Sequence, residues 1–250
     1  MPIDDLGAQL TLPRPPARVV SLVPSLTEAI AAEHRYLLAG ATDWCTHPRG
    51  LDVPRYRGTK NPDTAALIAA APDLVIANQE ENRELDVRRL RSAGVPVWVT
   101  RIETLAESFS SMRRLFEQAL MVPVPDWLPR AEASWAQPTE TRLSVVTAIW
   151  RDPWMVVGGR TFSNDLLARL GCRNPFEQHA ERYPHTDVAG IEATRPDLIL
   201  LPDEPYAFSA SDGPEAFAPG TARLISGRAL TWYGPSLVTA RRQIEAALAG

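Results

Sequence analysis

The sequence predicts an α/β protein of two lobes, each built on a parallel sheet, joined by a helical crossing. Short apolar segments alternate with amphipathic ones along both halves of the chain, as expected for parallel strands connected by helices. The segment APDLVIA at 71–77 returns as RPDLILL at 195–201, which indicates one supersecondary unit used twice. The stretch from Thr104 to Gln137, which has helical periodicity, lies between the two copies.

These features divide the chain into an N-terminal lobe (1–103), a helical linker (104–137) and a C-terminal lobe (138–250). At 250 residues and 45% hydrophobic content, the chain can bury the cores that two small domains need. A cleft between two lobes is a common place for a ligand, so we expect the ligand site there. The alternative is a single domain in which the linker is two ordinary helices.

The first lobe opens with a polar, hairpin-like segment, and a β-branched strand at 18–23 then leads directly into a helix. Ser25 and Glu28 have the spacing of a capping box, so we expect them at the start of that helix. The segment 43–63 is irregular and longer than most connections in compact domains, which suggests a functional loop. Further strands are expected at 38–42, 73–77 and 95–100, and helices at 64–71 and 83–93.

The linker carries apolar residues at three- and four-residue steps from Leu105 to Leu120, which predicts a helix with one apolar face. Two prolines in the segment 122–125 end this helix, and a second helix begins near Asp126 and runs to a turn at 138–141. In the second lobe, strands are expected at 143–149, 155–157 and 197–201, a helix at 162–170 and a last helix to about 248.

The composition excludes several classes of partner. The net charge is -4, from 26 basic and 30 acidic residues without long runs of like charge, so no nucleic-acid partner is expected. No segment reaches the roughly 18 apolar residues that span a bilayer. Cys45 and Cys172 lie in different halves without metal-ligand spacing, so we expect free thiols, with neither a disulfide nor a structural zinc site.

The N-terminus lacks the pattern of a signal peptide. Asp4 and Asp5 stand where a basic region is needed, and no apolar run follows them. We therefore expect a cytoplasmic protein. If a signal peptide has been trimmed from this sequence, the alternative is a periplasmic or lipid-anchored extracellular protein.

Motifs of the common enzyme classes are missing. The sequence contains no GxSxG, HExxH or GxxxxGK motif and no strand-linked GxGxxG. We therefore expect a binding protein rather than an enzyme, with no catalytic residue and no intrinsic cofactor.

Ligands of parallel sheets contact the carboxyl ends of the strands, and the loops expected there are rich in aromatic and cationic side chains. Aromatic rings offer a large contact area and a few polar groups set orientation, which suits a large, flat, amphipathic ligand. The candidate ligand-binding residues are Ser25, Trp44, His47, Arg49, Tyr56, Lys60, Trp150, Arg151, Trp154, Tyr183, His185, Glu204 and Tyr206.

Two histidines among these candidates raise the question of a metal. His47 and His185 come from opposite halves, and either imidazole could bind a metal ion. Neither has a carboxylate or a second histidine at ligand spacing, so we expect no metal site made by the protein itself. A metal held inside an organic chelate fits these residues better, because such a metal needs at most one axial contact from the protein.

Several motifs resemble those of one known family. They are RVVSLVPSLTE, the GATDWCTHP segment, the paired PDL strands, and WRDPWMVVGGRTFSNDLLARLGCRN followed by EPYAF. On these motifs, from about Asp4 to Tyr233, the chain resembles the class III substrate-binding proteins of ABC importers, the helical-backbone metal receptors. That family includes the periplasmic proteins that bind vitamin B12 and iron-siderophores.

The resemblance implies two Rossmann-like lobes joined by a backbone helix, with the ligand held between them and little hinge motion. Cobalamin is the first ligand that it suggests, because Trp44 stands where such proteins place an aromatic ring over the corrin, and Tyr183 stands at a second aromatic position. An iron-siderophore or haem comes next. For a siderophore, Arg49, Arg57 and Arg151 would contact the carboxylates or hydroxamates of the chelate.

The resemblance also bears on transport. In importer-coupled members a glutamate on each lobe pairs with arginines of the permease. Counting back from each PDL segment places Ala65 and Ala189 at these positions, which argues against docking to an ABC permease. A shift of one helical turn would put Asp63 or Glu192 there instead.

The sequence therefore predicts a cytoplasmic, non-transport binding protein for a small-molecule metal chelate. One alternative is an importer subunit whose signal peptide is missing from this chain. The other is an enzyme that processes a corrinoid or tetrapyrrole, in which His47, His185 or Glu204 would act as the general acid or base.

Overall fold

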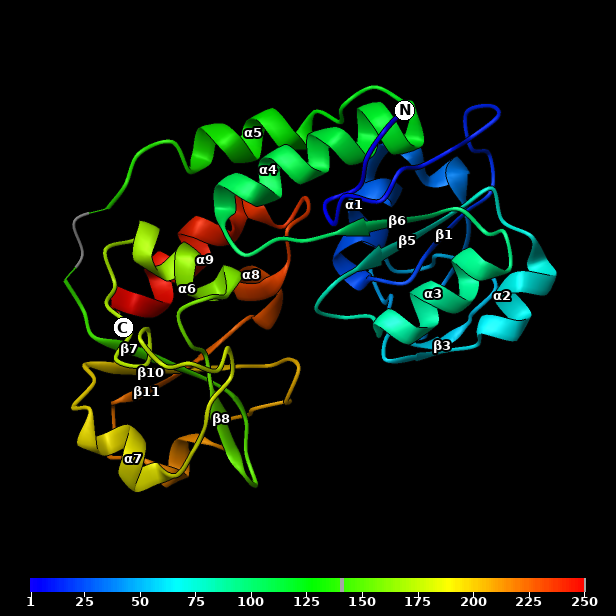
Figure 1. Cartoon of the computed structure of the whole chain (residues 1–250). Coiled ribbons are helices and arrows are strands. Elements are labelled where there is room, and N and C mark those ends of the chain that lie inside the picture. Colours follow the sequence, from blue (N-terminus) through cyan, green and yellow to red (C-terminus); the bar gives the residue numbers. More distant parts are fainter. Residues whose placement is uncertain (140–141, 250) are drawn as a thin grey trace. The chain divides into compact units, whose positions relative to one another are not determined.

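The structure is a computed structural model that describes residues 1–139 and 142–249. These residues form two compact units, and Figure 1 labels many of their helices and strands. Unit 1 comprises Met1–Ile102, Ala106–Leu128 and Tyr233–Pro235, and unit 2 comprises the other described residues. The predicted linker contributes to both units, because the division falls inside its helices. The turn expected at 138–141 includes residues 140 and 141, which lie outside the described residues.

Unit 1 is organised around four parallel strands in the order β2-β1-β5-β6. Every residue of β1, β5 and β6 is buried, as expected for a parallel sheet that is covered on both faces. The parallel sheet predicted for the first lobe is confirmed, and each strand ends within two residues of its expected bounds. The strands are β1 (Val19–Ser21), β2 (Leu38–Ala41), β5 (Leu74–Asn78) and β6 (Val97–Thr100).

Three helices of unit 1 connect these strands: α1 (Pro24–His34), α2 (Thr64–Ala70) and α3 (Glu84–Ser92). A short 3-10 turn, η1 (Arg35–Leu37), joins α1 to β2. Helices α2 and α3 pack against each other, as Figure 1 shows. The irregular segment 43–63 also contains a small antiparallel hairpin that the sequence pattern does not predict, formed by β3 (Arg57–Gly58) and β4 (Asn61–Pro62).

The capping box predicted at the start of α1 is wrong. Helix α1 begins at Pro24, its N-cap is Val23, and no side chain caps it. Proline at the first helical position fixes φ and has no amide to satisfy, so the helix starts one residue before Ser25. Ser25 is 2% exposed, and its Oγ has no hydrogen-bond partner among the described residues.

The linker contains α4 (Leu105–Arg114), a π-helical turn η2 (Leu115–Leu120) and α5 (Trp127–Ser134). Met121, with a φ of 55°, ends the π-helical turn, and the predicted break at 122–125 is confirmed. The four apolar residues of η2 are all buried, so the wider turn keeps its apolar side chains in the core.

The first ten residues fold onto unit 1. An antiparallel bridge between Ile3 and Gln9 confirms the hairpin-like opening. The Asp4 carboxylate is buried, and its Oδ2 lies 2.6 Å from Nη2 of Arg91. Side chains of α4 donate hydrogen bonds to the Asp5 carboxylate. The two acidic residues therefore bind this segment to the sheet and to α4.

Unit 2 contains a mixed sheet in the order β11-β10-β7-β8-β9. Strands β7, β10 and β11 are parallel, whereas β8 and β9 are antiparallel to their neighbours, so the second sheet is only partly parallel. Only residues 151–153 connect β7 to β8, and a parallel pair needs a crossover of about a dozen residues, so this connection requires a hairpin. The strands are β7 (Val145–Trp150), β8 (Trp154–Val156), β9 (His185–Thr186), β10 (Leu198–Pro202) and β11 (Ala222–Ile225).

The helices of unit 2 are α6 (Phe162–Arg169), α7 (Val188–Ala193), α8 (Gly227–Thr231) and α9 (Leu237–Ala249), with a short 3-10 turn η3 (Pro214–Ala216). Across residues 1–139 and 142–249, no helix combines the length and the apolar character needed to cross a membrane. Both cysteines are free, as predicted, and both are buried.

The repeat seen in the two PDL segments extends to their helices. The N-cap of α2 is Asp63, whose carboxylate accepts a hydrogen bond from the amide of Ala66 at 3.0 Å. The N-cap of α7 is Asp187, whose carboxylate accepts a hydrogen bond from the amide of Gly190 at 2.7 Å. The two helices therefore start by the same N-cap interaction.

The aspartates of the PDL segments also act alike. Asp73 Oδ2 accepts hydrogen bonds from the amides of Ala17 and Arg18, both at 2.9 Å, just before β1. Asp197 Oδ2 accepts one from the amide of Ser144 at 2.6 Å, just before β7. In each unit this carboxylate therefore joins the amino ends of two neighbouring parallel strands.

Candidate functional site

The carboxyl end of β2 in unit 1 carries Trp44. The strand ends at Ala41, and a tight turn follows in which the amide of Cys45 donates to the carbonyl of Thr42 at 3.1 Å. Trp44 is 66% exposed. A Cβ added at Gly58 would lie 3.0 Å from Trp44 Nε1, so the indole lies against this glycine of β3. The ring therefore offers an apolar surface at the strand ends.

Arg55 holds the loop that carries Trp44. Its guanidinium donates to the carbonyls of Thr42, Cys45 and Leu51 at 2.9, 3.0 and 2.8 Å. One side chain bound to three carbonyls fixes the curve of the loop. No sequence pattern singles out Arg55, because the segment 43–63 holds several arginines and their spacing does not tell which one binds the loop itself.

The Cys45 thiol is buried beneath the same loop. Its Sγ lies 3.0 Å from Oγ1 of Thr27 and 3.2 Å from Oγ1 of Thr42. Burial raises the pKa of the Cys45 thiol above its ordinary value of 9.0, and these hydroxyls oppose that rise only in part. The group is therefore a neutral thiol at pH 7 and has a structural role in the loop.

Two buried asparagines fix the connection after β5. Asn82 Oδ1 accepts from the amide of Asn78 at 2.9 Å, and its Nδ2 donates to the carbonyl of Thr59 at 2.9 Å. Asn78 Oδ1 accepts from the amide of Glu80 at 2.8 Å, and its Nδ2 lies 3.1 Å from Oγ1 of Thr100. This network joins the connection to β6 and to the turn between β3 and β4.

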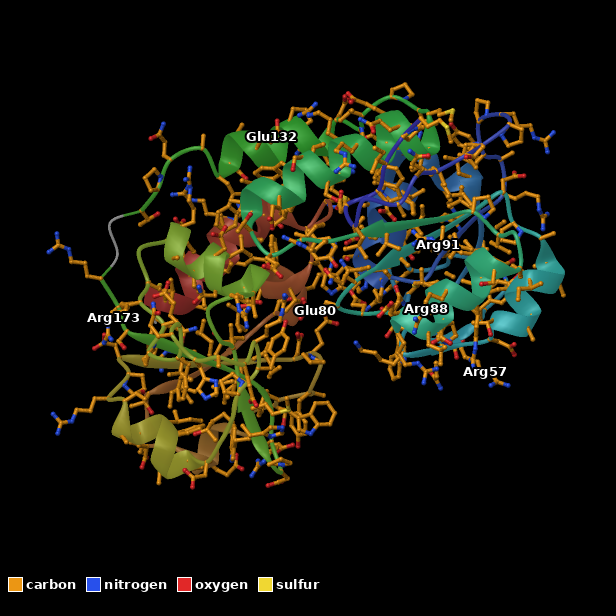
Figure 2. All side chains as sticks on the ribbon, in the orientation of Figure 1. Arg57, Glu80, Arg88, Arg91, Glu132 and Arg173 are labelled. Carbon is orange, nitrogen blue, oxygen red and sulfur yellow. The ribbon has the colours of Figure 1, made fainter. Side chains whose placement is uncertain are left out.

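The predicted cationic residues of unit 1 lie in the same two loops. Lys60 Nζ donates to the carbonyl of Glu80, a residue labelled in Figure 2, so the β3–β4 turn contacts the connection after β5. His47 is half-buried, and its Nδ1 lies 3.2 Å from Oγ1 of Thr46. Arg49 is exposed. Trp44 therefore lies against the β3–β4 hairpin, whose turn carries Lys60, and His47 and Arg49 follow Trp44 in the loop that Arg55 holds.

Two predicted contact residues of unit 1 are buried. Tyr56 is 8% exposed and packs in the hydrophobic core with Leu67, and Gly40 leaves room for its ring. Ser25 lies in the first turn of α1, where Gly234 approaches its carbonyl oxygen. Neither side chain presents a surface to a ligand in this structure.

Unit 2 carries a second aromatic surface at the carboxyl ends of β7 and β10. Trp150 is the last residue of β7 and is 42% exposed. Its ring lies 5.4 Å from the ring of Tyr206 at an angle of 75°, which is an edge-to-face pair. Tyr206 follows β10, and its ring lies 4.7 Å from that of the buried Phe208. The half-buried Tyr206 therefore joins the exposed Trp150 to the core of unit 2.

Arg151 is engaged by carboxylates beside this pair. Its Nη1 lies 2.6 Å from Oε1 of Glu215 and also contacts Oδ1 of Asp212. Its Nε lies 3.5 Å from Oδ2 of Asp152. The hydroxyl of Tyr206 donates to Asp212 Oδ2 at 2.8 Å, so the aromatic pair and the ion pairs form one connected group.

These contacts shift the pKa values of the group. The hydrogen bond from Arg151 lowers the pKa of Glu215 below its ordinary value of 4.5, so this carboxylate is ionised at neutral pH. The hydrogen bond to Asp212 raises the pKa of Tyr206 above its ordinary value of 10.0, so the phenol keeps its proton. The bonds to Glu215 and Asp212 also raise the pKa of Arg151.

Trp154 belongs to the core of unit 2. It is buried, its ring stacks on Phe208 with centroids 5.8 Å apart, and its edge meets Phe217 at 5.2 Å. The guanidinium of Arg151 lies 5.4 Å from the centre of its ring. Trp154 therefore holds Arg151 by a cation–π contact and offers no open face.

The other predicted residues of unit 2 lie on separate elements. His185 is exposed on the short strand β9, opposite Met155 of β8. Tyr183 is half-buried and comes two residues earlier. Glu204 follows β10 and lies against Gly227 at the start of α8. Within the described part of the chain, no group of three His, Cys, Asp or Glu side chains is arranged to hold a metal ion.

Comparisons with known proteins give a consistent result. No protein-family model matches the sequence. The chain is 22% identical over 200 residues to a Vitamin B12-binding protein of Vibrio campbellii, with 74% of this chain and 70% of the relative covered. It is 26% identical over 216 residues to a Bacillus subtilis protein named an uncharacterized ABC transporter substrate-binding lipoprotein, with 80% and 68% covered.

A solved structure shares the fold. The periplasmic heme-binding protein of Pseudomonas aeruginosa superimposes with a TM-score of 0.76 at 23% identity, over 93% of this chain and 92% of that one. The chain therefore has the two-lobed fold of these binding proteins, and the resemblance predicted from its motifs is confirmed.

Proposed function

We propose that this chain, which is similar to substrate-binding proteins of ABC importers, binds a metal chelate or a tetrapyrrole-like molecule. Cobalamin is the first candidate, and an iron-siderophore or haem comes next. The names of the similar proteins support this range, because they include a vitamin B12-binding and a heme-binding protein. The cleft predicted between the lobes concerns how the two units are placed relative to each other, and it stays a prediction.

The observation that carries the proposal is the exposure of aromatic rings at the carboxyl ends of strands in both units. In unit 1 the ring is Trp44, and in unit 2 it is Trp150, which packs edge-to-face on the half-buried Tyr206. An exposed indole is costly in water, and a flat ring system recovers that cost by stacking on it. The sheet ends are also where ligands of parallel α/β proteins bind.

Titration of the purified protein with cobalamin, cobinamide, haemin and ferric siderophores tests the proposal. Quenching of tryptophan fluorescence and a shift of the ligand's visible absorbance are expected with at least one of them, at micromolar concentration or below. Tyr36→Ala is a matched control, because Tyr36 is 72% exposed but precedes the amino end of β2. If none of the four ligand classes changes either signal, the proposal is wrong.

Two exposed alanines bear on a role in transport. Ala65 and Ala189 are exposed on the first turns of α2 and α7, and alanine offers neither charge nor geometry to a permease arginine. We propose on this basis a binder that does not serve an importer, and its cytoplasmic location stays a prediction. The importer alternative is favoured by a relative that is named an ABC transporter substrate-binding lipoprotein.

We also propose that binding is not coupled to catalysis. The similar proteins are named as binding proteins, which supports this reading. The enzyme alternative assigns acid–base work to His47, His185 or Glu204. Metal-insertion assays with His47→Ala and His185→Ala decide between them, and turnover that exceeds a protein-free control and falls in either variant would favour the enzyme.

A further inference from the structure

Carboxylates edge the aromatic surface of unit 2. We call Trp150, Arg151, Tyr206, Asp212 and Glu215 together the platform. Trp150 presents its ring to solvent, and the side chains of Asp212 and Glu215 remain 41% and 50% exposed although both contact Arg151. The carboxylates of the platform are therefore accessible to solvent, as is the ring of Trp150.

Arg151 does not make this surface positive. Its guanidinium contacts Asp212 and Glu215, lies over the ring of Trp154, and has Asp152 3.5 Å from its Nε. One cation against three carboxylates leaves an excess of two negative charges. The raised pKa of Tyr206 is consistent with this excess, because the bond to Asp212 and the surrounding carboxylates disfavour a phenolate there.

We propose, on the basis of the function proposed above, that the platform selects the ligand by charge. It accepts a neutral or cationic chelate whose rim carries N–H donors such as amides, and it disfavours a chelate whose rim carries carboxylates. Amide N–H groups can donate to the exposed oxygens of Asp212 and Glu215 while the ring system lies on Trp150. A carboxylate in the same place meets like charge and finds Arg151 already bound.

This selection separates ligands that the aromatic rings alone do not distinguish. A corrinoid carries amide side chains around its macrocycle, whereas haem carries two propionates. Both are flat enough to stack on an indole, so the discrimination must come from the rim. Between solvent-exposed charges a few ångströms apart, one unit of charge changes affinity by about three- to tenfold.

The experiment compares cobalamin with a cobalamin monocarboxylic acid, in which one side-chain amide has been hydrolysed. The two ligands share their ring system and differ by one charge. The ratio of their Kd values therefore measures the effect of a rim carboxylate on affinity, without the contribution of the ring. Asp212→Asn with Glu215→Gln removes two charges and keeps oxygen acceptors for Tyr206 and for the amide of Gly213. Arg151→Gln removes the positive charge, so it should change the ratio of Kd values in the opposite direction. The matched control is Glu192→Gln, which removes one carboxylate charge on α7.

We expect wild-type protein to bind cobalamin about three- to tenfold more tightly than the acid at low ionic strength, and less selectively in 0.5 M salt. The ratio should approach one in the double variant, increase in Arg151→Gln and stay at the wild-type value in Glu192→Gln. If the carboxylates had only a structural role, the double variant would bind both ligands more weakly by the same factor, and the ratio would not change.

The outcomes separate this inference from the proposed function. Equal affinity of wild-type protein for the two ligands, or an unchanged ratio in the single variant Glu215→Gln and in the double variant, would overturn the inference while binding itself stands. If neither ligand binds wild-type protein, cobalamin is excluded as the ligand and the inference fails with it.

Discussion

Asp73 shows how one side chain can join two strands of a parallel sheet. Its carboxylate accepts two backbone amides at the start of β1, and these bonds, the Ala17 amide foremost, lower its pKa below the ordinary value of 3.8. A carboxylate whose pKa is lowered by folding contributes stability above its unfolded pKa and loses that contribution as the pH falls through its folded pKa. The contribution of Asp73 should therefore be complete at neutral pH and disappear in acid.

We predict that Asp73→Asn lowers the free energy of unfolding at pH 7 by about 1 kcal/mol, because charge-assisted hydrogen bonds become ordinary ones. Urea unfolding at pH 7, 4 and 3 measures the difference from wild type, which should shrink as the pH falls below 3.8. Asp52→Asn is the control, since Asp52 is an exposed carboxylate. A difference that stays constant with pH would show that the charge of Asp73 is not involved.

Trp44 and Tyr183 are the aromatic residues on which ligand affinity is expected to depend most. We predict that Trp44→Ala and Tyr183→Ala each weaken binding by about 1 to 3 kcal/mol, the range for truncated aromatic anchors. Isothermal titration of the ligand identified in the fluorescence screen measures the loss, and circular dichroism should show that both variants stay folded. Unchanged affinity in both would mean that the ligand binds elsewhere.

At the candidate site, the sequence indicates which side chains are aromatic, but it does not predict which of them are exposed. The sequence places Trp44, Tyr56 and Trp154 in loops or at strand ends, and all three are aromatic. In the structure only Trp44 is exposed, because Gly40 lets Tyr56 enter one core and two phenylalanines enclose Trp154 in the other. Such packing depends on residues that are distant in the sequence, which local patterns do not contain.

Among the elements, the loop between β2 and β3 depends on Arg55. We predict that Arg55→Ala weakens ligand binding by about 1 to 2 kcal/mol while leaving most of the stability intact, because three loop carbonyls lose their donor and Trp44 loses its fixed position. The matched control is Arg88→Ala, since Arg88 is 66% exposed and its Nε lies 3.7 Å from Oε1 of Glu84 on the same helix, α3. Equal effects of the two substitutions on Kd would contradict the role of Arg55.

The C-cap residue of α2 has a strained backbone conformation. Ala71 has a φ of 45°, a region that glycine occupies without cost. We predict that Ala71→Gly raises the free energy of unfolding by about 0.5 kcal/mol, and that Ala69→Gly, inside the exposed part of the same helix, lowers it by about 0.5 to 1 kcal/mol. Urea midpoints measured side by side test the pair, and a loss of stability in Ala71→Gly would refute the strain.

Elements with strong local signals could be predicted, and those fixed by tertiary geometry could not. Apolar runs predict the bounds of β1, β5 and β10 to within two residues, and two prolines predict the break in the linker. The predicted start of α1 is wrong. The helix begins at Pro24, and the expected cap by Ser25 does not form. The π-helical turn η2 and the β3–β4 hairpin also lack a local signature, since core packing and loop contacts define them.

For the whole molecule, the open question is whether binding serves transport. We predict that the wild-type protein binds its chelate and does not stimulate a reconstituted cobalamin or siderophore importer. Radiolabelled uptake into vesicles measures this, with a vitamin B12-binding protein as positive control. Charge reversal at Glu192 is the informative variant, because Asp63 already caps α2 and its replacement would disturb that helix. Uptake that requires this chain and is lost in Glu192→Lys would contradict the prediction.

The burial of both cysteines has a practical consequence for labelling chemistry. Burial raises the pKa of Cys172 to about 11 and also raises that of Cys45, so both native thiols are shielded and protonated and should react slowly with maleimides. Cysteines introduced at the exposed positions Ala65 and Ala189 would then be the only fast-reacting sites, one in each unit. A donor and an acceptor dye on this pair would report in single molecules whether the distance between the two units changes when a ligand binds.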